Sequence, residues 1–126
     1  MILRPRFRVL CDGETVFGPG RVDVLELIGK TGSLRSAATG MGMSYMRAWK
    51  IVKSLNAWFR PGLVEVARGG KKGGGAKLTD AGREVVRVYR RMEKETERAV
   101  GNSWKELRRY LVRKILSEKR NYPRSR

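Results

Sequence analysis

Three cations recur along one stretch of the chain at the spacing of a helix face. Arg47, Lys50 and Lys53 follow one another in steps of three residues within GSLRSAATGMGMSYMRAWKIVKSLN, residues 32–56. Side chains three residues apart lie on the same face of an α-helix. Arg and Lys on such a face can donate hydrogen bonds to guanine edges and phosphates in the major groove of B-DNA. The spacing predicts a helix face whose chemistry is hydrogen-bond donation to an anion or a base edge.

The composition argues against catalysis. The 126 residues include no His and a single cysteine, Cys11, so the usual catalytic base, an intrachain disulfide and a cysteine zinc cluster are absent. We find no acid pair and no nucleophile motif. An enzyme is therefore not expected, and neither is a metal site.

The charge balance points to a polyanion as partner. Lys and Arg number 29 against 12 Asp and Glu, a formal net charge of +17, far beyond what solubility requires. No stretch approaches the roughly 20 apolar residues of a membrane span, and the N-terminus has too short an apolar region for a secretion signal. Nucleic acid is favoured over a membrane, and we expect a cytoplasmic, nucleoid-associated protein.

Two helices must position the cations. Ser33 and Ser44 stand where N-caps belong, and Gly40 and Gly42 permit a sharp turn between the helices. The second helix, expected over 44–58, has an apolar stripe formed by Tyr45, Ala48, Val52, Leu55 and Phe59 and widened by Trp49. This pattern predicts a helix-turn-helix with aromatics facing inward. An αα-hairpin with a solvated face, in a protein that never touches DNA, fits the helix pair alone equally well.

A glycine-rich basic loop follows the helix pair. Short strands are predicted at 63–66 and 76–78, and residues 68–75 between them read RGGKKGGG. Glycines allow close approach of the backbone to a phosphate, so we interpret the segment as a β-wing that clamps flanking DNA. A solvated tip is the plain alternative. A nucleotide-binding nest is weaker, because the glycine spacing matches neither GxxxxGK[ST] nor GxGxxG.

The N-terminal residues predict a hairpin and then a helix. Basic and apolar residues alternate over 4–10, Asp12-Gly13 is a strong hairpin turn, and residues 15–17 resume a strand. The hairpin is expected to pack on the domain or to pair with a second copy of the chain, and a terminal arm is the alternative. Pro19 suits the start of a helix through Lys30. Apolar residues on two sides of that helix fit either burial on both sides or a dimer contact.

Apolar stripes continue toward the C-terminus. Thr79 is expected to cap a helix, Gly101-Asn102 to break it, and Ser103 with Glu106 to restart it as a capping box. A small winged domain offers little core this far along the chain, so we prefer pairing between two chains to burial in one. The residues expected at a dimer interface are Val24, Leu27, Ile28, Tyr89, Met92, Trp104, Leu107, Leu111 and Ile115.

Several of these motifs together resemble a known family. They are Gly32-Ser33, Ala37-Ala38, Gly42-Met43-Ser44-Tyr45, Ala48-Trp49, Asn56, Leu63-Val64-Glu65, Gly69-Gly70, Gly73-Gly74-Gly75-Ala76 and Leu78-Thr79 with Gly82. Over about residues 18 to 100 the chain resembles the DNA-binding domain of the molybdate-responsive regulator ModE. LysR-type regulators share a looser version of the pattern. The resemblance implies a dimeric winged helix-turn-helix that binds palindromic DNA, with the recognition helix in 44–53 and the wing tip in 69–76.

The chain departs from that family in one respect. Full-length members carry molybdate-binding domains after the DNA-binding one, whereas this sequence ends in a basic tail, so it resembles a single-domain relative. No cofactor is predicted; molybdate and tungstate stay open as ligands, although no residue of the sequence supports them. Regulation by a separate effector protein is equally open.

These observations combine into one expected architecture. The fold class is mainly α with small β elements: a winged helix-turn-helix with an N-terminal β-hairpin and long C-terminal dimerisation helices. The expected units are a hairpin arm over 1–18, the winged domain over 19–100, a dimerisation helix over 101–118 and a disordered basic tail over 119–126. The residues expected at DNA are Ser33, Arg35, Ser36, Ser44, Tyr45, Met46, Arg47, Lys50, Lys53, Ser54, Arg68, Lys71, Lys72, Gly73, Gly74 and Lys77.

The expected function is sequence-specific regulation of transcription by a homodimer on double-stranded DNA. An architectural, chromatin-like protein with little sequence preference would use the same charge. An RNA-binding module would require exposed aromatics for base stacking, whereas Tyr45, Trp49 and Phe59 are predicted to face inward.

Overall fold

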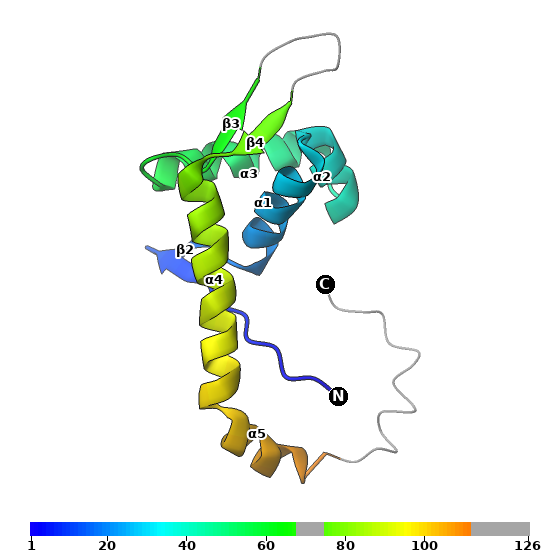
Figure 1. Cartoon of the computed structure of the whole chain (residues 1–126), viewed down its shortest axis with the longest axis vertical. Coiled ribbons are helices and arrows are strands. Elements are labelled where there is room, and N and C mark those ends of the chain that lie inside the picture. The colour runs from blue at the N-terminus through cyan, green and yellow to red at the C-terminus, as the bar shows by residue number, and fades with distance from the viewer. Residues whose placement is uncertain (68–74, 112–126) are drawn as a thin grey trace.

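A computed structural model of the chain describes residues 1–67 and 75–111. Its elements in chain order are β1 (Val9–Cys11), β2 (Glu14–Phe17), α1 (Pro19–Thr31), α2 (Leu34–Met41), α3 (Tyr45–Trp58), β3 (Val64–Val66), β4 (Ala76–Leu78), α4 (Asp80–Ala99) and α5 (Gly101–Arg108). The first three helices and the β3–β4 hairpin form a head. Helix α4 runs out of this head, and α5 turns away at its far end (Figure 1). The predicted class, mainly α with small β elements, is confirmed.

Helix α1 lies at the centre of the core. Val22, Val24, Leu25 and Ile28 are all completely buried, because α2, α4 and β4 pack around the helix. Val24 and Ile28 therefore cannot face a second chain in this conformation, and their assignment to a dimer interface is wrong. Of the two alternatives open for this helix, burial on both sides holds.

The N-terminal hairpin packs on the head through its second strand. Strands β1 and β2 are antiparallel, and Asp12 and Gly13 form the turn with φ of 49° and 79°, as Asp-Gly in a hairpin predicts. Val16 and Phe17 of β2 are buried, whereas all of β1 is exposed. Strand β1 begins only at Val9, so residues 4–8 lie outside the hairpin.

The turn between α2 and α3 forms at one glycine. Helix α2 continues through Gly40 to Met41, and Gly42 adopts a φ of 66°. Gly40 has a different role, because a Cβ there would lie 3.1 Å from Cδ1 of Leu27; its lack of a side chain lets α1 and α2 approach. Both predicted N-caps are confirmed: Ser33 Oγ accepts from Ser36 N, and Ser44 Oγ accepts from Arg47 N, each at 3.1 Å.

Helix α3 and the β3–β4 hairpin are joined by a side chain. Asn56 Oδ1 accepts from the backbone N–H of Leu63 at 2.8 Å and of Val64 at 3.1 Å, and Asn56 Nδ2 donates to Val64 O at 2.9 Å. The hairpin pairs Val64 with Leu78 in antiparallel register. Its other strand is tied to the helix-turn-helix, because Ala76 N donates to Gly32 O at 3.0 Å.

The C-terminal helices depart from the prediction in two ways. Helix α4 ends at Ala99 and α5 begins directly at Gly101 with no side-chain cap; Ser103 lies inside α5, so the predicted capping box is wrong. Helix α5 ends at Arg108, where the last turn tightens through bonds such as Tyr110 N to Leu107 O at 3.0 Å. The prediction of one continuous helix over 101–118 is therefore wrong, because the helix is interrupted after Arg108. Ile115 and the tail over 119–126 lie outside the described residues.

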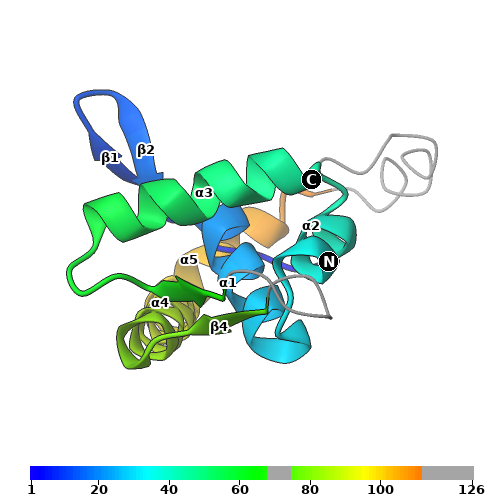
Figure 2. The same cartoon turned by 90° about the horizontal axis from the view of Figure 1, so that it is seen from above.

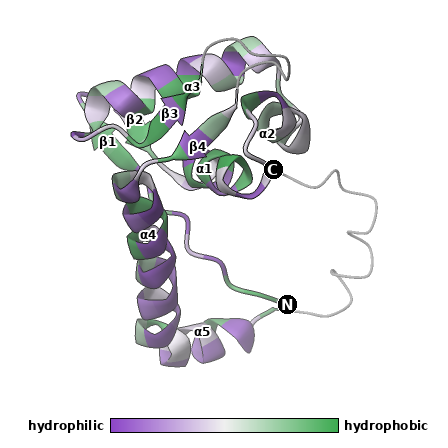
Figure 3. Ribbon diagram, turned by 45° about the horizontal axis from the view of Figure 1, so that its top comes forward, coloured by the Kyte–Doolittle hydropathy of each residue, from purple (hydrophilic) through white to green (hydrophobic). Residues whose placement is uncertain are grey.

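Hydrophilic residues dominate the ribbon of α4 where it leaves the head (Figure 3). Within residues 1–67 and 75–111, the structure contains no helix with the length and apolarity that crossing a membrane requires.

Candidate nucleic-acid interface

Helix α3 has a buried apolar face and an exposed basic face. Ala48, Val52 and Leu55 are at most 1% exposed. Arg47, Lys50 and Lys53 lie on the exposed side together with Met46, and α3 contains no Asp or Glu. Figure 2 shows α3 across the face turned to the viewer, with the β1–β2 hairpin beyond one flank and β4 beyond the other. The predicted basic face exists and is accessible.

A second group of predicted residues lies at the start of α2 and α3. Tyr45 is 43% exposed, so the prediction that it faces inward is wrong. The Arg35 guanidinium lies 5.1 Å from the centroid of the Tyr45 ring, an arrangement in which the positive charge is attracted to the ring face. Arg35 and Ser36 are exposed beside it. This pair extends the polar surface from α3 onto α2.

Ser54 does not belong to the exposed face. Its hydroxyl accepts a hydrogen bond from Nη1 of Arg21 at 2.9 Å, and the same nitrogen donates to Val16 O at 2.8 Å. Ser54 therefore points toward α1 and β2, and its assignment as a DNA contact is wrong. Periodicity alone did not reveal this partner, because Arg21 comes from a distant part of the chain.

The β3–β4 hairpin contributes one described cation of the predicted set. Lys77 is exposed and its Nζ lies 3.4 Å from Glu65 Oε2 on the paired strand. Between two exposed side chains such a pair is weak, so Lys77 can exchange it for another anion. Arg68, Lys71, Lys72, Gly73 and Gly74 were predicted at the tip of this hairpin and lie outside the described residues.

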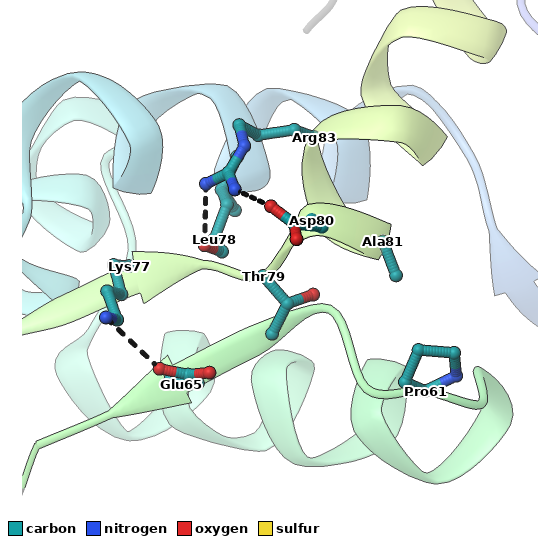
Figure 4. Close-up of a pocket in the computed structure, with 8 residues that line it drawn as sticks. All are labelled: Pro61, Glu65, Lys77, Leu78, Thr79, Asp80, Ala81 and Arg83. Carbon is teal, nitrogen blue, oxygen red and sulfur yellow. Dashed lines mark hydrogen bonds and ion pairs between the residues drawn. The ribbon is translucent and has the colours of Figure 1, made fainter.

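A depression of about 480 Å³ lies between this hairpin and the start of α4 (Figure 4). The polar groups that line it bind one another: Lys77 pairs with Glu65, and Arg83 pairs with Asp80 and donates to Leu78 O at 3.0 Å. The hydroxyl of Thr79 donates to Gly62 O at 2.6 Å and accepts from Gly82 N. These groups stabilise the junction and leave little free capacity for a ligand.

An arginine on α4 organises a cluster of ion pairs away from the basic face. Arg90 binds Glu26 Oε1 at 2.6 Å and Asp23 Oδ1 at 2.8 Å on α1, and Glu93 Oε1 at 2.9 Å on its own helix. The hydrogen bond from Arg90 lowers the pKa of Glu26, and the same bond raises the pKa of Arg90. The cluster fixes α4 against α1.

The predicted dimer residues from α4 to the end of the described chain divide into two groups. Tyr89 is only 4% exposed, because its ring packs edge-on against Phe7 and Phe17; its place at a dimer interface is wrong. Burial raises the pKa of the Tyr89 hydroxyl. The exposed group consists of Met92, Leu107 and Leu111, with Trp104 half-buried.

The sequence prediction missed a second group of cations. Arg6 and Arg8 of the N-terminal segment line a groove of about 1070 Å³ together with Arg21 and Arg47. The alternation of Arg and Phe over residues 6–8 was the available signal. We interpreted that alternation only as a strand.

The site thus combines two helices joined by a tight turn, a basic outer helix face and a two-stranded hairpin beside that helix. No model of a known protein family matches the chain. Individual proteins, however, are similar to it in sequence. The chain is 38% identical over 89 residues to the molybdenum-pterin-binding protein MopA of Rhodobacter capsulatus, covering 71% of this chain and 34% of that protein.

Two further relatives have similar sequence identity to the chain. The molybdenum transport protein ModE of Azotobacter vinelandii is 37% identical over 89 residues, 71% of this chain and 33% of that protein. The DNA-binding transcriptional dual regulator ModE of Escherichia coli K12 is 39% identical over 71 residues, 56% of this chain and 27% of that protein. The chain is thus similar to ModE and Mop proteins, and it spans 27–34% of the length of these three. The resemblance to ModE is confirmed.

Proposed function

We propose that the protein is a sequence-specific, DNA-binding transcription regulator of the ModE type. The observation that carries this proposal is the exposed face of α3, on which Arg47, Lys50 and Lys53 stand with no acidic residue on the helix. Cations on a rigid helix suit the major groove of B-DNA. The name of the E. coli relative, a DNA-binding transcriptional dual regulator, supports the same function.

The exposed residues are proposed to have two roles, according to their position along α3. In the proposed complex Arg47 and Lys50, with Ser44, Tyr45 and Met46, contact base edges, because they occupy the first turns of α3, the part of a recognition helix that contacts base edges. Lys53 lies further along the helix and binds phosphate. The β3–β4 hairpin acts as the wing, with Lys77 on the flanking backbone.

The proposal includes a homodimer. Exposed apolar side chains of Met92 on α4, Leu107 on α5 and Leu111 just after α5 form a surface for a second copy, away from α3. Two recognition helices about 34 Å apart would then meet successive major grooves of a palindromic site. We place the protein in the cytoplasm, on the nucleoid, and propose that it binds DNA without a cofactor.

Selection of bound sequences from random duplex DNA tests the proposal. The wild-type chain should enrich one palindromic motif, and R47A/K50A should lose the enrichment. K94A/R98A is the matched control, since it removes two exposed cations from α4 and should leave the motif unchanged. Equal affinity for all duplexes would favour the architectural alternative, to which a net charge of +17 is also suited. Adding molybdate, tungstate or a cell extract to the same assay tests for an effector.

A further inference from the structure

A groove on one flank of α3 is lined by four arginines. It has a volume of about 1070 Å³ and lies between the N-terminal segment, the start of α1 and the turn from α2 to α3. Arg6 and Arg8 line it from the N-terminal segment, Arg21 from α1 and Arg47 from α3. Arg47 therefore belongs both to this groove and to the exposed face of α3, and the two surfaces are continuous.

The N-terminal segment is fastened to α4 by Phe7. The Phe7 ring packs edge-on against Tyr89, with ring centroids 6.2 Å apart, and Tyr89 Oη donates to Phe7 O at 3.1 Å. In an extended chain, neighbouring side chains point to opposite sides. Anchoring Phe7 inward therefore turns Arg6 and Arg8 outward, where both are exposed. The packing of Phe7 therefore accounts for the exposure of both arginines.

The charges in the groove are not balanced within the described part of the chain. Arg6, Arg8 and Arg47 have no ion pair there, and Arg21 donates only to the uncharged acceptors Val16 O and Ser54 Oγ. The one acid in the lining is Asp23, whose carboxylate already binds Arg90 at 2.8 Å. The depression in Figure 4 differs, because its charged side chains bind one another.

Uncompensated guanidinium groups in an open groove suit phosphate. Arg presents a fork of donors that binds phosphate oxygens in pairs and is less strongly hydrated than an ammonium group. The groove also lies on a particular side of α3. Ser54 lies on the flank of α3 that faces the groove, because it binds Arg21, which lines the groove. Asn56 lies on the opposite flank of α3, where it binds β3. A duplex seated on α3 can thus meet cations on both flanks.

We infer that this groove binds the phosphodiester backbone of duplex DNA beside the segment that α3 contacts, on the side opposite the β3–β4 hairpin. The inference rests on the proposed function. It adds a second contact region, in which Arg6 and Arg8 are the residues that bind phosphate and Phe7 with Tyr89 positions them. Such contacts fix the register of the protein on DNA without reading bases.

The test compares R6Q/R8Q with R108Q/R109Q on the duplex enriched by selection. Both double variants remove two exposed arginine charges, but Arg108 and Arg109 lie at the end of α5, away from α3. Arg21 is left intact because it holds Val16 and Ser54. Two lost phosphate contacts should reduce the slope of log K against log salt by about 2, and phosphate-ethylation interference should disappear at the flanking positions alone. R108Q/R109Q should retain both properties, and thermal unfolding should confirm that both variants fold.

The outcomes are distinct. If the wild type binds the duplex but R6Q/R8Q keeps the wild-type slope and interference pattern, the groove does not bind backbone, while the proposed function stands. If R6Q/R8Q and R108Q/R109Q reduce the slope equally, the effect is one of net charge, and the inference is overturned. If the wild type binds no duplex at all, the proposed function fails and the groove inference fails with it.

Discussion

Asn56 exchanges hydrogen bonds with the backbone of Val64 in both directions, accepting from its N–H at 3.1 Å and donating to its carbonyl oxygen at 2.9 Å. The side-chain amide thereby pairs with the backbone of β3 in the way that the backbone of a neighbouring strand would. Its Oδ1 also accepts from Leu63 N. Because α3 carries the basic face and β3 begins the hairpin, these bonds join the hairpin directly to α3, in addition to the bond from Ala76 N to Gly32 O.

Replacing Asn56 with Ala should destabilise the protein by about 2–3 kcal/mol, since partly buried backbone groups of Leu63 and Val64 lose their partner. Urea unfolding followed by circular dichroism measures the change. Asn102→Ala is the matched control, because Asn102 is exposed on α5 and should change the free energy of unfolding little. Equal stability of the two variants would show that the Asn56 bonds contribute nothing net.

Gly82 provides a second test of the same junction. It is buried in the first turn of α4, and a Cβ at this position would overlap the carbonyl oxygen of Leu63. Backbone cannot move aside as a side chain can, so Gly82→Ala should cost roughly 1–3 kcal/mol despite the better helix propensity of Ala.

Gly101→Ala is the control for this substitution. Gly101 is also helical, but an added Cβ would meet nothing within 4 Å, and the change should be neutral or stabilise α5 by up to about 1 kcal/mol. Thermal unfolding of both variants separates the effects. A Gly82→Ala protein as stable as Gly101→Ala would mean that α4 does not pack on Leu63 as described.

The Arg90 cluster predicts a dependence of stability on pH. Arg90→Met leaves Asp23, Glu26 and Glu93 without their shared cation and should cost about 1–2 kcal/mol at pH 7, a value reduced by the partial exposure of the cluster. The pKa of Glu26 in the folded state is lowered from its ordinary 4.5. Its contribution to stability is therefore present above about pH 4.5 and is lost as the pH falls below that value.

The measurement is the difference in unfolding free energy between wild type and Arg90→Met, taken at pH 7 and at successively lower pH. The difference should shrink on acidification. Arg87→Met is the control, because Arg87 pairs only with the exposed Glu84 on its own helix, so its effect should be much smaller. A difference that does not change with pH would contradict the assignment to Glu26.

Local backbone chemistry explains which features the sequence could predict. Ser33, Ser44 and Thr79 cap helices as predicted, and Asp12-Gly13 forms the hairpin turn. Each depends on groups within three residues along the chain, so the residue types alone determine the outcome. The buried positions of α3 recur at three- and four-residue steps, a spacing that the sequence of the helix itself contains.

The capping box predicted at Ser103 failed locally, because α5 already begins at Gly101. The other predictions that failed depend on contacts between distant segments. Ser54 lies at the edge of the basic face, and only its bond to Arg21 turns it away. Helix α1 is apolar on two sides, a pattern that cannot distinguish a buried helix from a dimer surface, so Val24 and Ile28 were misassigned. The groove containing Arg6 was missed because it forms from four separate segments.

The two cation roles on α3 predict different mutant behaviour. Arg47→Ala should cost about 1–3 kcal/mol on the selected site and relax preference at one base position, if the lost contact is to guanine. Lys53→Ala should weaken binding to all duplexes alike and reduce the salt slope by about 0.9, as expected for one phosphate. With about eight phosphates neutralised, the wild-type slope should be near −7. Fluorescence anisotropy on matched and mismatched duplexes at several salt concentrations measures both, and identical behaviour of the two variants would refute this division of roles.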